Sequence, residues 1–447
     1  MYYNNILEVI GNTPLVKINK LNPNPKVLML AKLDFLNPGG SIKDRIGLPL
    51  IIDGEESGKL KQGGTIVEPT SGNTGVGLAQ AAVIKGYKTV FVMPDKMSEE
   101  KRNLLRAYGA RVVITPTAVG PEDPRSYYRE SDRLAREISG AYKPDQYSNQ
   151  ENPQAHFKTT GPEIWEQTEG KVTHVVIGMG TGGTITGVGK YLKKKNPKIK
   201  IIGVDPEGSG YYQFFKTGKM PKIFKTYKVE GIGEDFLPGT MDFKIVDEVI
   251  TVTDKESFIT ARNLARLEGI LAGGSSGLAL FAARKVIKKI KKGLVVLILP
   301  DSGKNYLTKF YNDEWMRDFG YMTEKDDTIT ELLNKKLHFV SVLSDKSPTE
   351  AISLMKKYNI SQLPVVEKKK VVGTICERIL LKALYGQAKI PITVGEIMER
   401  DFITLPVNAS KSQLGRALSK KEMVIICNSK GKPIDVLTRI DFLASLN

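Results

Sequence analysis

The chain is poor in cysteine and has no long hydrophobic run. Its two cysteines, Cys376 and Cys427, are far apart and in no paired motif, so neither a disulfide framework nor a thiolate metal site is expected. The longest strongly apolar run, LVVLILP at 294–300, is far too short to span a bilayer. The first residues, MYYNNILEVIGNTP, lack the basic and apolar regions of a signal peptide. These absences predict a cytoplasmic protein without a membrane partner.

Positive charge exceeds negative charge, with a formal net charge of +17. The lysines occur in short runs, such as 193–195, 288–292 and 368–370, that are scattered along the chain. Nucleic-acid-binding proteins instead concentrate their charge on one element and interleave it with aromatic or base-reading side chains. We therefore expect solvated helix faces, no nucleic-acid partner and a weak attraction for anionic ligands.

At 447 residues the chain is long enough for two or three domains. Between about residues 27 and 300, short β-branched runs alternate with amphipathic helical stretches. This alternation predicts an α/β domain with a mainly parallel sheet, in which ligands bind at the carboxyl ends of the strands. The expected strands are 27–33, 65–69, 88–94, 111–115, 172–180, 199–206 and 293–300.

A polar stretch, MTEKDDTIT, separates this region from a differently patterned tail. The tail contains two related units, each with a Ser or Thr turn that opens a helix, an apolar strand, a turn, a second strand and a closing helix. Repeats of this kind usually pack as a pseudo-symmetric pair. We predict a first domain at 1–322, a linker at 323–335 and a separate tail domain at 336–447.

Lys43 follows the glycine-rich loop LNPGG and stands at the mouth of a predicted helix. The positive end of the helix dipole disfavours a cation at this place. Lys43 is therefore either a solvated surface lysine, as most lysines are, or an amine with a lowered pKa of the kind that forms Schiff bases. Its position alone leaves both interpretations open.

Three glycine-rich loops lie where predicted strands meet helices. The loop 68–77, EPTSGNTGVG, offers hydroxyls, an amide and free backbone N–H groups, which suit a carboxylate or a phosphate. The loop 178–189, GMGTGGTITGVG, carries threonine hydroxyls among its glycines, which suits a terminal monophosphate. A dinucleotide fold would want an acid about twenty positions on, and Asp205 meets that need only loosely. In the loop 271–280, LAGGSSGLAL, a serine is either a helix N-cap or part of a site.

A lysine, a phosphate loop and a carboxylate loop on one α/β scaffold suggest a pyridoxal 5′-phosphate (PLP) site. PLP needs a lysine for its aldehyde, donors for its phosphate and a partner for its ring nitrogen. The motifs NPGGSIKDR, EPTSGNTG, GTGGT and GGSSG, in this order, resemble those of the fold-type II PLP enzymes of the cysteine synthase and cystathionine β-synthase family. The resemblance covers residues 4–320, and VEGIGEDFLP and LPDSGKNYLTKFYNDEWM bring it closer to the cystathionine β-synthases. The tail resembles a pair of CBS domains.

The resemblance implies a role for each matching residue. Lys43 would hold PLP as a Schiff base and transfer protons, Asn73 would bind the ring hydroxyl oxygen, and Ser275 would face the ring nitrogen. The phosphate would be bound by Gly180, Thr181, Gly182, Gly183 and Thr184. The α-carboxylate of the substrate would be bound by Thr70, Ser71, Gly72, Asn73, Thr74 and Gln146.

The implied activity is the PLP-dependent β-replacement that forms L-cystathionine from L-serine and L-homocysteine, with release of hydrogen sulfide from cysteine as a side activity. Two alternatives stay open: a cysteine synthase that uses O-acetylserine or serine with sulfide, and a non-catalytic sensor of adenosyl ligands. Glu234 stands where animal members of the family carry tyrosine, which leaves the second-substrate preference open. Haem is not expected, because the catalytic motifs begin almost at Met1 and His156, His174 and His338 lie within the folded domains. No other metal site is expected, and the protein is expected to be a homodimer or a higher homo-oligomer.

In the second tail unit, VLTRID at 436–441 has the Thr-x-x-Asp spacing with which CBS domains hold a ribose. Thr438 and Asp441 are therefore candidates for binding an adenosyl ligand. The first unit offers Thr374 and Glu377 in GTICER, where the longer acid would crowd a ribose. The alternative is a tail that serves only to dimerise or stiffen the protein.

Overall fold

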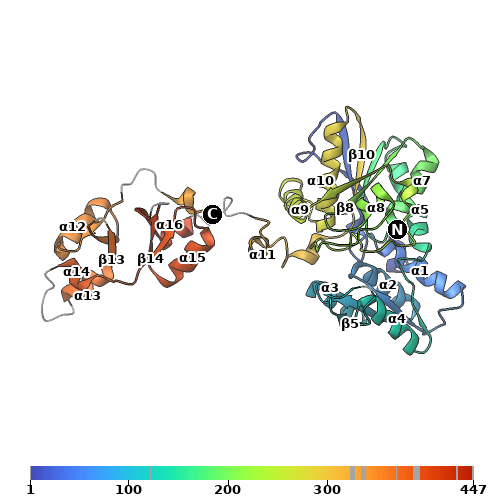
Figure 1. The fold of residues 1–447 in the computed structure, drawn as a ribbon, viewed down its shortest axis with the longest axis horizontal. Coiled ribbons are helices and arrows are strands. Elements are labelled where there is room, and N and C mark those ends of the chain that lie inside the picture. Colours follow the sequence, from blue (N-terminus) through green and yellow to red (C-terminus); the bar gives the residue numbers. More distant parts are fainter. Residues whose placement is uncertain are drawn as a thin grey trace. The chain divides into compact units, whose positions relative to one another are not determined.

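The computed structural model describes residues 2–120, 122–322, 328–333, 339–368, 370–385, 393–428 and 431–444. The chain forms two compact units, Met1–Tyr321 and Met322–Asn447 (Figure 1). His338 and much of the predicted linker at 323–335 lie outside the described residues. No helix in the described ranges has the length and apolar character that a bilayer span requires.

The first unit contains two sheets. The larger sheet consists, in spatial order, of β1 (Leu15–Lys17), β2 (Val27–Leu33), β10 (Gly293–Leu299), β7 (His174–Gly178), β8 (Lys200–Pro206) and β9 (Glu248–Val252). The smaller sheet consists of β5 (Arg111–Thr115), β4 (Lys88–Pro94), β3 (Thr65–Pro69) and β6 (Ala141–Tyr142). All neighbouring strands are parallel except β1, which runs antiparallel to β2. The predicted α/β fold with mainly parallel sheets is thereby confirmed.

Helices surround both sheets of this unit. They are α1 (Asp44–Glu56), α2 (Asn73–Lys85), α3 (Glu99–Ala107), α4 (Tyr127–Glu137), α5 (Glu151–Lys158), α6 (Thr160–Gln167), α7 (Gly183–Lys195), α8 (Tyr211–Thr217), α9 (Asp254–Glu268), α10 (Gly274–Lys289) and α11 (Asp313–Asp318). Short 3-10 helices are η1 (Ile6–Val9), η2 (Asp34–Leu36), η3 (Phe243–Ile245) and η4 (Gly303–Tyr306). Figure 1 shows α2, α3 and α4 gathered around the smaller sheet, and α7, α9 and α10 around the larger one.

Local sequence signals account for several helix limits. Thr253 and Glu256 form a capping box at the start of α9, and Gly269 ends that helix in the left-handed conformation. Ser98 caps α3 by accepting a hydrogen bond from the backbone N–H of Lys101. These short-range contacts place each helix at the end of a strand, and so place the loops between them at the carboxyl edge of a sheet.

The second unit repeats one arrangement twice. Its first half contains β11 (Val342–Leu343), α12 (Pro348–Tyr358), β12 (Gln362–Glu367), β13 (Lys370–Cys376), α13 (Glu377–Tyr385) and α14 (Val394–Ile397). Its second half contains β14 (Ile403–Pro406), α15 (Lys411–Lys420), β15 (Met423–Cys427), β16 (Pro433–Thr438) and α16 (Arg439–Ala444), with η6 (Ile329–Leu332) packed against its core. In both halves the first strand pairs parallel with the second, and the second pairs antiparallel with the third. Capping boxes begin both α12 and α15, as the repeated Ser and Thr turns predicted.

Candidate active site

Lys43 is the N-cap residue of α1 and points its amine across to the loop after β7. The Nζ atom donates a hydrogen bond to Thr181 Oγ1 at 3.2 Å. Burial lowers the pKa of Lys43 to about 8, and Glu234 and Glu68 oppose that shift. A neutral, nucleophilic amine is thus available near neutral pH. The main cause is removal from water, whereas the sequence suggested the helix dipole.

The loop between β3 and α2 borders a cavity of about 300 Å³. Ser71, Asn73, Thr74 and Gln146 line this cavity, so four of the predicted carboxylate-binding residues are brought together. Thr74 donates its hydroxyl proton to Gln146 Oε1 at 2.7 Å, and Gln146 Nε2 donates to the carbonyl oxygen of Pro69 at 3.1 Å. Within the described parts of the chain, the second N–H of the Gln146 amide has no acceptor.

Two residues of the same motif do not line the cavity. The Thr70 hydroxyl oxygen is buried and accepts hydrogen bonds from the backbone N–H groups of Gly72 at 3.0 Å and Gly75 at 3.3 Å. Gly72 has a φ of +124°, which a residue with a side chain rarely adopts. Thr70 and Gly72 therefore shape the loop, and their neighbours present the donors.

The loop between β7 and α7 borders a second, smaller cavity. Gly180, Thr181, Gly182 and Thr184 line it together with Lys43. The backbone N–H groups of residues 180–185 donate to no acceptor in the described part of the chain. They lie at the N-terminus of α7, where free donors and the helix dipole favour an anion.

Two residues that the sequence suggested for this site, Gly183 and Asp205, do not line the smaller cavity. Gly183 does not line the cavity, and a Cβ atom at that position would lie 1.9 Å from Asn152 Oδ1. Asp205, the acid that a dinucleotide fold would use, lines neither cavity, and its buried carboxylate accepts the backbone N–H of Tyr212 at 2.9 Å. The loop thus has the donors for a monophosphate, and Asp205 is not placed to bind a ribose there.

Asn73 and Ser275 complete the smaller cavity, next to a buried carboxylate that the sequence did not suggest. Asn73 Nδ2 donates to Asp301 Oδ2 at 3.0 Å, and the Tyr306 hydroxyl donates to the same oxygen at 2.6 Å. Burial raises the pKa of Asp301. Asp301 and Tyr306 belong to the motif LPDSGKNY, which the sequence marked without assigning a role to either residue.

The donors around the smaller cavity fit PLP. One lysine amine is available for an aldehyde, the free N–H groups of 180–185 and two threonine hydroxyls suit a phosphate, and the amide of Asn73 and the hydroxyl of Ser275 suit the polar atoms of a pyridine ring. In the described ranges no group of three or more histidine, cysteine or acidic side chains could hold a metal ion.

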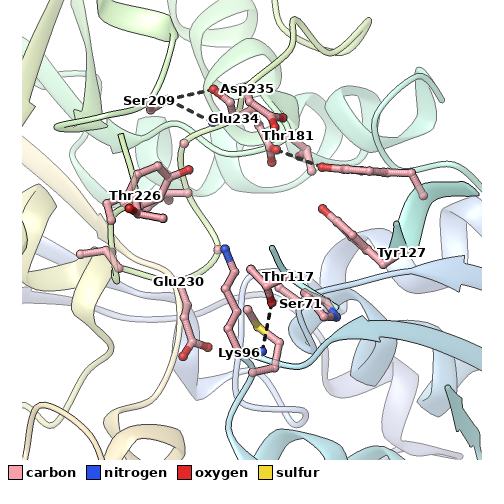
Figure 2. Close-up of a pocket in the computed structure, with 18 of the residues that line it drawn as sticks. Ser71, Lys96, Thr117, Tyr127, Thr181, Ser209, Thr226, Glu230, Glu234 and Asp235 are labelled. Atoms are coloured by element: carbon pink, nitrogen blue, oxygen red, sulfur yellow. Dashed lines mark hydrogen bonds between the residues drawn. The ribbon is translucent and has the colours of Figure 1, made fainter. Parts of the chain in front are cut away.

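The larger cavity has a lysine on one side and two carboxyl groups on another. Lys96 lies with Ser71 and Thr117 on one side, and Glu234 and Asp235 lie on the other (Figure 2). Burial and the neighbouring Asp235 raise the pKa of Glu234 to about 8, and Lys96 opposes that shift. Of these charged residues only Glu234 was noted in the sequence, as a departure from tyrosine.

Aromatic side chains line the same cavity near these charges. The rings of Tyr127 and Tyr128, at the start of α4, have centroids 4.0 Å apart, and the hydroxyls of Tyr127 and Tyr147 lie 3.2 Å apart. Phe236 packs against Tyr128 and Tyr147 at centroid distances of 5.5 and 5.2 Å. Sequence reasoning missed this cluster because its members come from three separate segments.

Comparisons with known proteins cover both units. The family model for pyridoxal-phosphate dependent enzymes matches residues 6–301, and the CBS domain model matches residues 328–386 and 394–447. A cystathionine β-synthase of Dictyostelium discoideum is 40% identical to the chain over 99% of this chain and 92% of its own length. The chain belongs to the cystathionine β-synthase family. It is a PLP-dependent enzyme with a CBS-domain pair, as the motifs predicted.

Other relatives of this cystathionine β-synthase family member match one or both units. The cystathionine β-synthase of Mus musculus is 40% identical over 95% of this chain and 78% of its own. A cysteine synthase of Staphylococcus aureus is 45% identical but covers only 68% of this chain. The solved structure of an O-acetylserine dependent cystathionine β-synthase from Helicobacter pylori has a TM-score of 0.63, with 40% identity over 69% of this chain and 98% of that one.

The predicted adenosyl-binding pair lies at the end of β16. Asp441 Oδ2 accepts hydrogen bonds from the backbone N–H of Thr438 at 2.8 Å and from its hydroxyl at 2.6 Å. Thr438 pairs with Met423, the first residue of β15. In the first repeat the equivalent place, the last residue of β13 paired with the first of β12, is taken by Cys376 opposite Gln362.

This register corrects the expected correspondence between the repeats. Counting three residues on from Cys376 makes Ile379, and not Glu377, the counterpart of Asp441. Thr374 lies two residues earlier in β13 and shares a bridge with Glu399. The first repeat therefore lacks a Thr-x-x-acid pair at this place, and the difference is larger than a lengthened acid.

Proposed function

We propose that this chain forms L-cystathionine by replacing the β-hydroxyl of L-serine with the thiol of L-homocysteine. One C–O bond breaks, one C–S bond forms and water is released. Near-full-length similarity to cystathionine β-synthases supports this reaction. The observation that carries the choice of second substrate is the placement of Lys96 opposite the carboxyl groups of Glu234 and Asp235 across the larger cavity (Figure 2). The ammonium of homocysteine would favour the ionised form of Glu234, and its carboxylate would pair with Lys96, whereas sulfide has neither group.

PLP, when bound, draws electrons from the Cα atom of an amino acid and so makes the β-substituent a leaving group. Lys43 is assigned the covalent link to PLP and the proton transfer at Cα, for which its lowered pKa is suited. The loop 180–184 is assigned the phosphate, Asn73 the ring hydroxyl oxygen and Ser275 the ring nitrogen.

The α-carboxylate of serine is assigned to Ser71, Thr74 and Gln146. The free N–H of Gln146 and the N-terminus of α2 supply donors on one side of the cavity. The aromatic cluster of Tyr127 and Tyr147 displaces water from that side, which protects the reacting Cβ atom from hydrolysis.

Cysteine synthesis is the second candidate. The shorter cysteine synthase of S. aureus shares the first unit, and a hydrogen sulfide-producing enzyme of Fusobacterium nucleatum has the same fold with a TM-score of 0.64 and 36% identity. The H. pylori relative is described as O-acetylserine dependent. Release of hydrogen sulfide from cysteine by this chain would use the same residues, with cysteine in place of serine.

Steady-state kinetics separate these reactions. We expect kcat/KM to be higher for homocysteine than for sulfide, with serine or O-acetylserine as the first substrate. Glu234→Gln and Lys96→Met should each raise the KM for homocysteine about tenfold, the value of a hydrogen bond to a charged group, and leave sulfide unaffected. Lys59→Met removes an exposed lysine and serves as the matched control. Equal losses with homocysteine and sulfide would overturn the assignment of these two residues to homocysteine, and a higher kcat/KM for sulfide would favour cysteine synthesis.

For the second unit we propose an adenosyl ligand at Thr438 and Asp441. A carboxylate that already accepts two hydrogen bonds from Thr438 is fixed in place to receive ribose hydroxyls. We also propose a cytoplasmic homodimer or higher homo-oligomer. The exposed Val83 and Ile84 at the end of α2 support a contact between copies.

A further inference from the structure

Asn152 is a fully buried side chain at the start of α5 that contacts one residue of each predicted anion site. Its Nδ2 atom lies 2.7 Å from the carbonyl oxygen of Gln146 and 3.1 Å from Thr181 Oγ1. Gln146 belongs to the carboxylate side of the larger cavity, and Thr181 belongs to the loop before α7. One amide thus connects two segments that approach the cofactor from different sides.

The Gln146 carbonyl determines which way this amide faces. A carbonyl oxygen only accepts hydrogen bonds, so the atom of Asn152 beside it must be the nitrogen. The second N–H of the same nitrogen then points at Thr181, whose hydroxyl oxygen must accept it. Lys43 Nζ is a second donor to that oxygen, at 3.2 Å.

A hydroxyl group has one proton to donate and two lone pairs to accept with. Asn152 donates to Thr181 Oγ1, Lys43 also donates to it as long as its amine is not linked to PLP, and no described residue accepts the hydroxyl proton. The proton is therefore left for the smaller cavity, which Thr181 lines. A phosphate oxygen is the acceptor that such a donor fits.

The other end of the amide is held without a partner. Asn152 Oδ1 is buried and has no hydrogen-bond partner in the described structure, which is a state that folded proteins usually avoid. It lies against Gly183, where any Cβ atom would come within 1.9 Å of it. The fourth residue of the loop GTGG is thus a glycine because it makes room for Asn152, while the residues before it form the cavity wall.

We propose that Asn152 is a positioning residue for PLP, which fixes the Thr181 hydroxyl as a donor to the phosphate and ties that loop to the Gln146 segment. This inference rests on the assignment of residues 180–184 to the phosphate. Asn152 itself touches neither cavity, so it acts through Thr181.

A double-mutant cycle on Asn152 and Thr181 tests this positioning role through the dissociation constant of PLP. The constant is measured by titrating the full-length apoenzyme with PLP and following bound PLP by absorbance and by 31P NMR. Asn152→Ala should weaken PLP binding about tenfold, and Thr181→Val at least as much, since each removes a charge-assisted hydrogen bond or its orientation. In the Thr181→Val background, Asn152→Ala should change the dissociation constant less than twofold. The 31P shift of bound PLP should move in both single variants.

Controls separate positioning from folding. Asn149→Ala removes a nearby asparagine that bonds Asp53, Pro144 and the backbone N–H of Glu151 at the start of α5, but neither Gln146 nor Thr181, and it should leave PLP affinity unchanged. Asn152→Asp keeps the shape but accepts from Thr181, so it should bind PLP more weakly than wild type even if Asn152→Ala does not fold. Equal losses from Asn152→Ala in both backgrounds, or wild-type affinity in Asn152→Asp, would overturn the proposal. Wild-type affinity in Thr181→Val would instead remove the phosphate assignment beneath it.

Discussion

Replacing Glu68 by glutamine should change how the stability of the first unit depends on pH. Glu68 ends the apolar part of β3, is fully buried, and its two carboxylate oxygens accept the backbone N–H groups of Asp145 and Gln146 at 2.9 Å each. Burial raises the pKa of Glu68 from 4.5 to about 7, although those two hydrogen bonds oppose the shift. The carboxyl group thus loses its proton at a lower pH in the unfolded chain than in the folded one.

This difference in pKa makes the contribution of Glu68 to the free energy of unfolding smaller as the pH rises. The stabilising contribution of Glu68 is fully present below pH 4.5 and is lost as the pH rises toward 7, because the unfolded state releases its proton first. One pKa unit corresponds to about 1.4 kcal/mol, so the contribution falls by about 2.5 kcal/mol between pH 5 and 8. Glutamine does not titrate and removes this dependence.

Urea unfolding of the PLP-saturated wild type and the Glu68→Gln variant, at intervals between pH 5 and 8, measures the effect. The free energy of unfolding of the wild type, minus that of the variant, should decline steadily with pH. The absolute difference also contains the hydrogen bonds that glutamine makes less well, but those do not titrate. A difference that stays flat over this range would refute the argument that burial controls the ionisation of Glu68.

Three further outcomes are expected. Covalent capture of PLP by the apoenzyme should be half-maximal near pH 8, the pKa to which burial lowers Lys43, and a midpoint above pH 10 would mark an ordinary lysine. Arg45→Met should lower the free energy of unfolding by about 3–5 kcal/mol, because it leaves buried carboxylates without their ion-pair partner. Arg133→Met, at an exposed ion pair, should change it by less than about 1 kcal/mol, and similar unfolding curves for the two variants would contradict this. S-adenosylmethionine at a hundred times its dissociation constant should stabilise the full chain by about 2.7 kcal/mol in a thermal shift assay, and Asp441→Ala should abolish the shift. No shift in the wild type would leave the second unit as an assembly module.

Much of the fold could be predicted because buried parallel strands have a recognisable sequence pattern. A strand covered on both faces is a continuous apolar run, as in GLVVLILP, and all seven predicted runs contain strands. The strands β1, β6 and β9 were not predicted. Two of them have only two or three residues, and β9 lies at the edge of its sheet, so their formation depends on a neighbouring strand.

The residues of the candidate site were likewise only partly predictable from the sequence. Lys43 and the glycine loops could be found because each motif is a local conformation with a local chemical signature. The sequence could not show which residues of a motif face the cavity. Thr70, for example, accepts hydrogen bonds from backbone N–H groups of its own loop and does not line the cavity. Glu230, which lines both cavities, forms an ion pair with Lys101 at 2.8 Å, and these positions are 129 residues apart, so nothing local in the sequence marks the pair.

The unequal repeats of the second unit bear on how a ligand would titrate the protein. Thr438 and Asp441 have Cys376 and Ile379 as their counterparts, so only one repeat of the pair presents a hydroxyl and a carboxylate at this place. A ligand that needs both groups would saturate at one equivalent per chain. Its binding curve to an isolated chain would then be hyperbolic, and any sigmoidal response of activity would report communication between subunits.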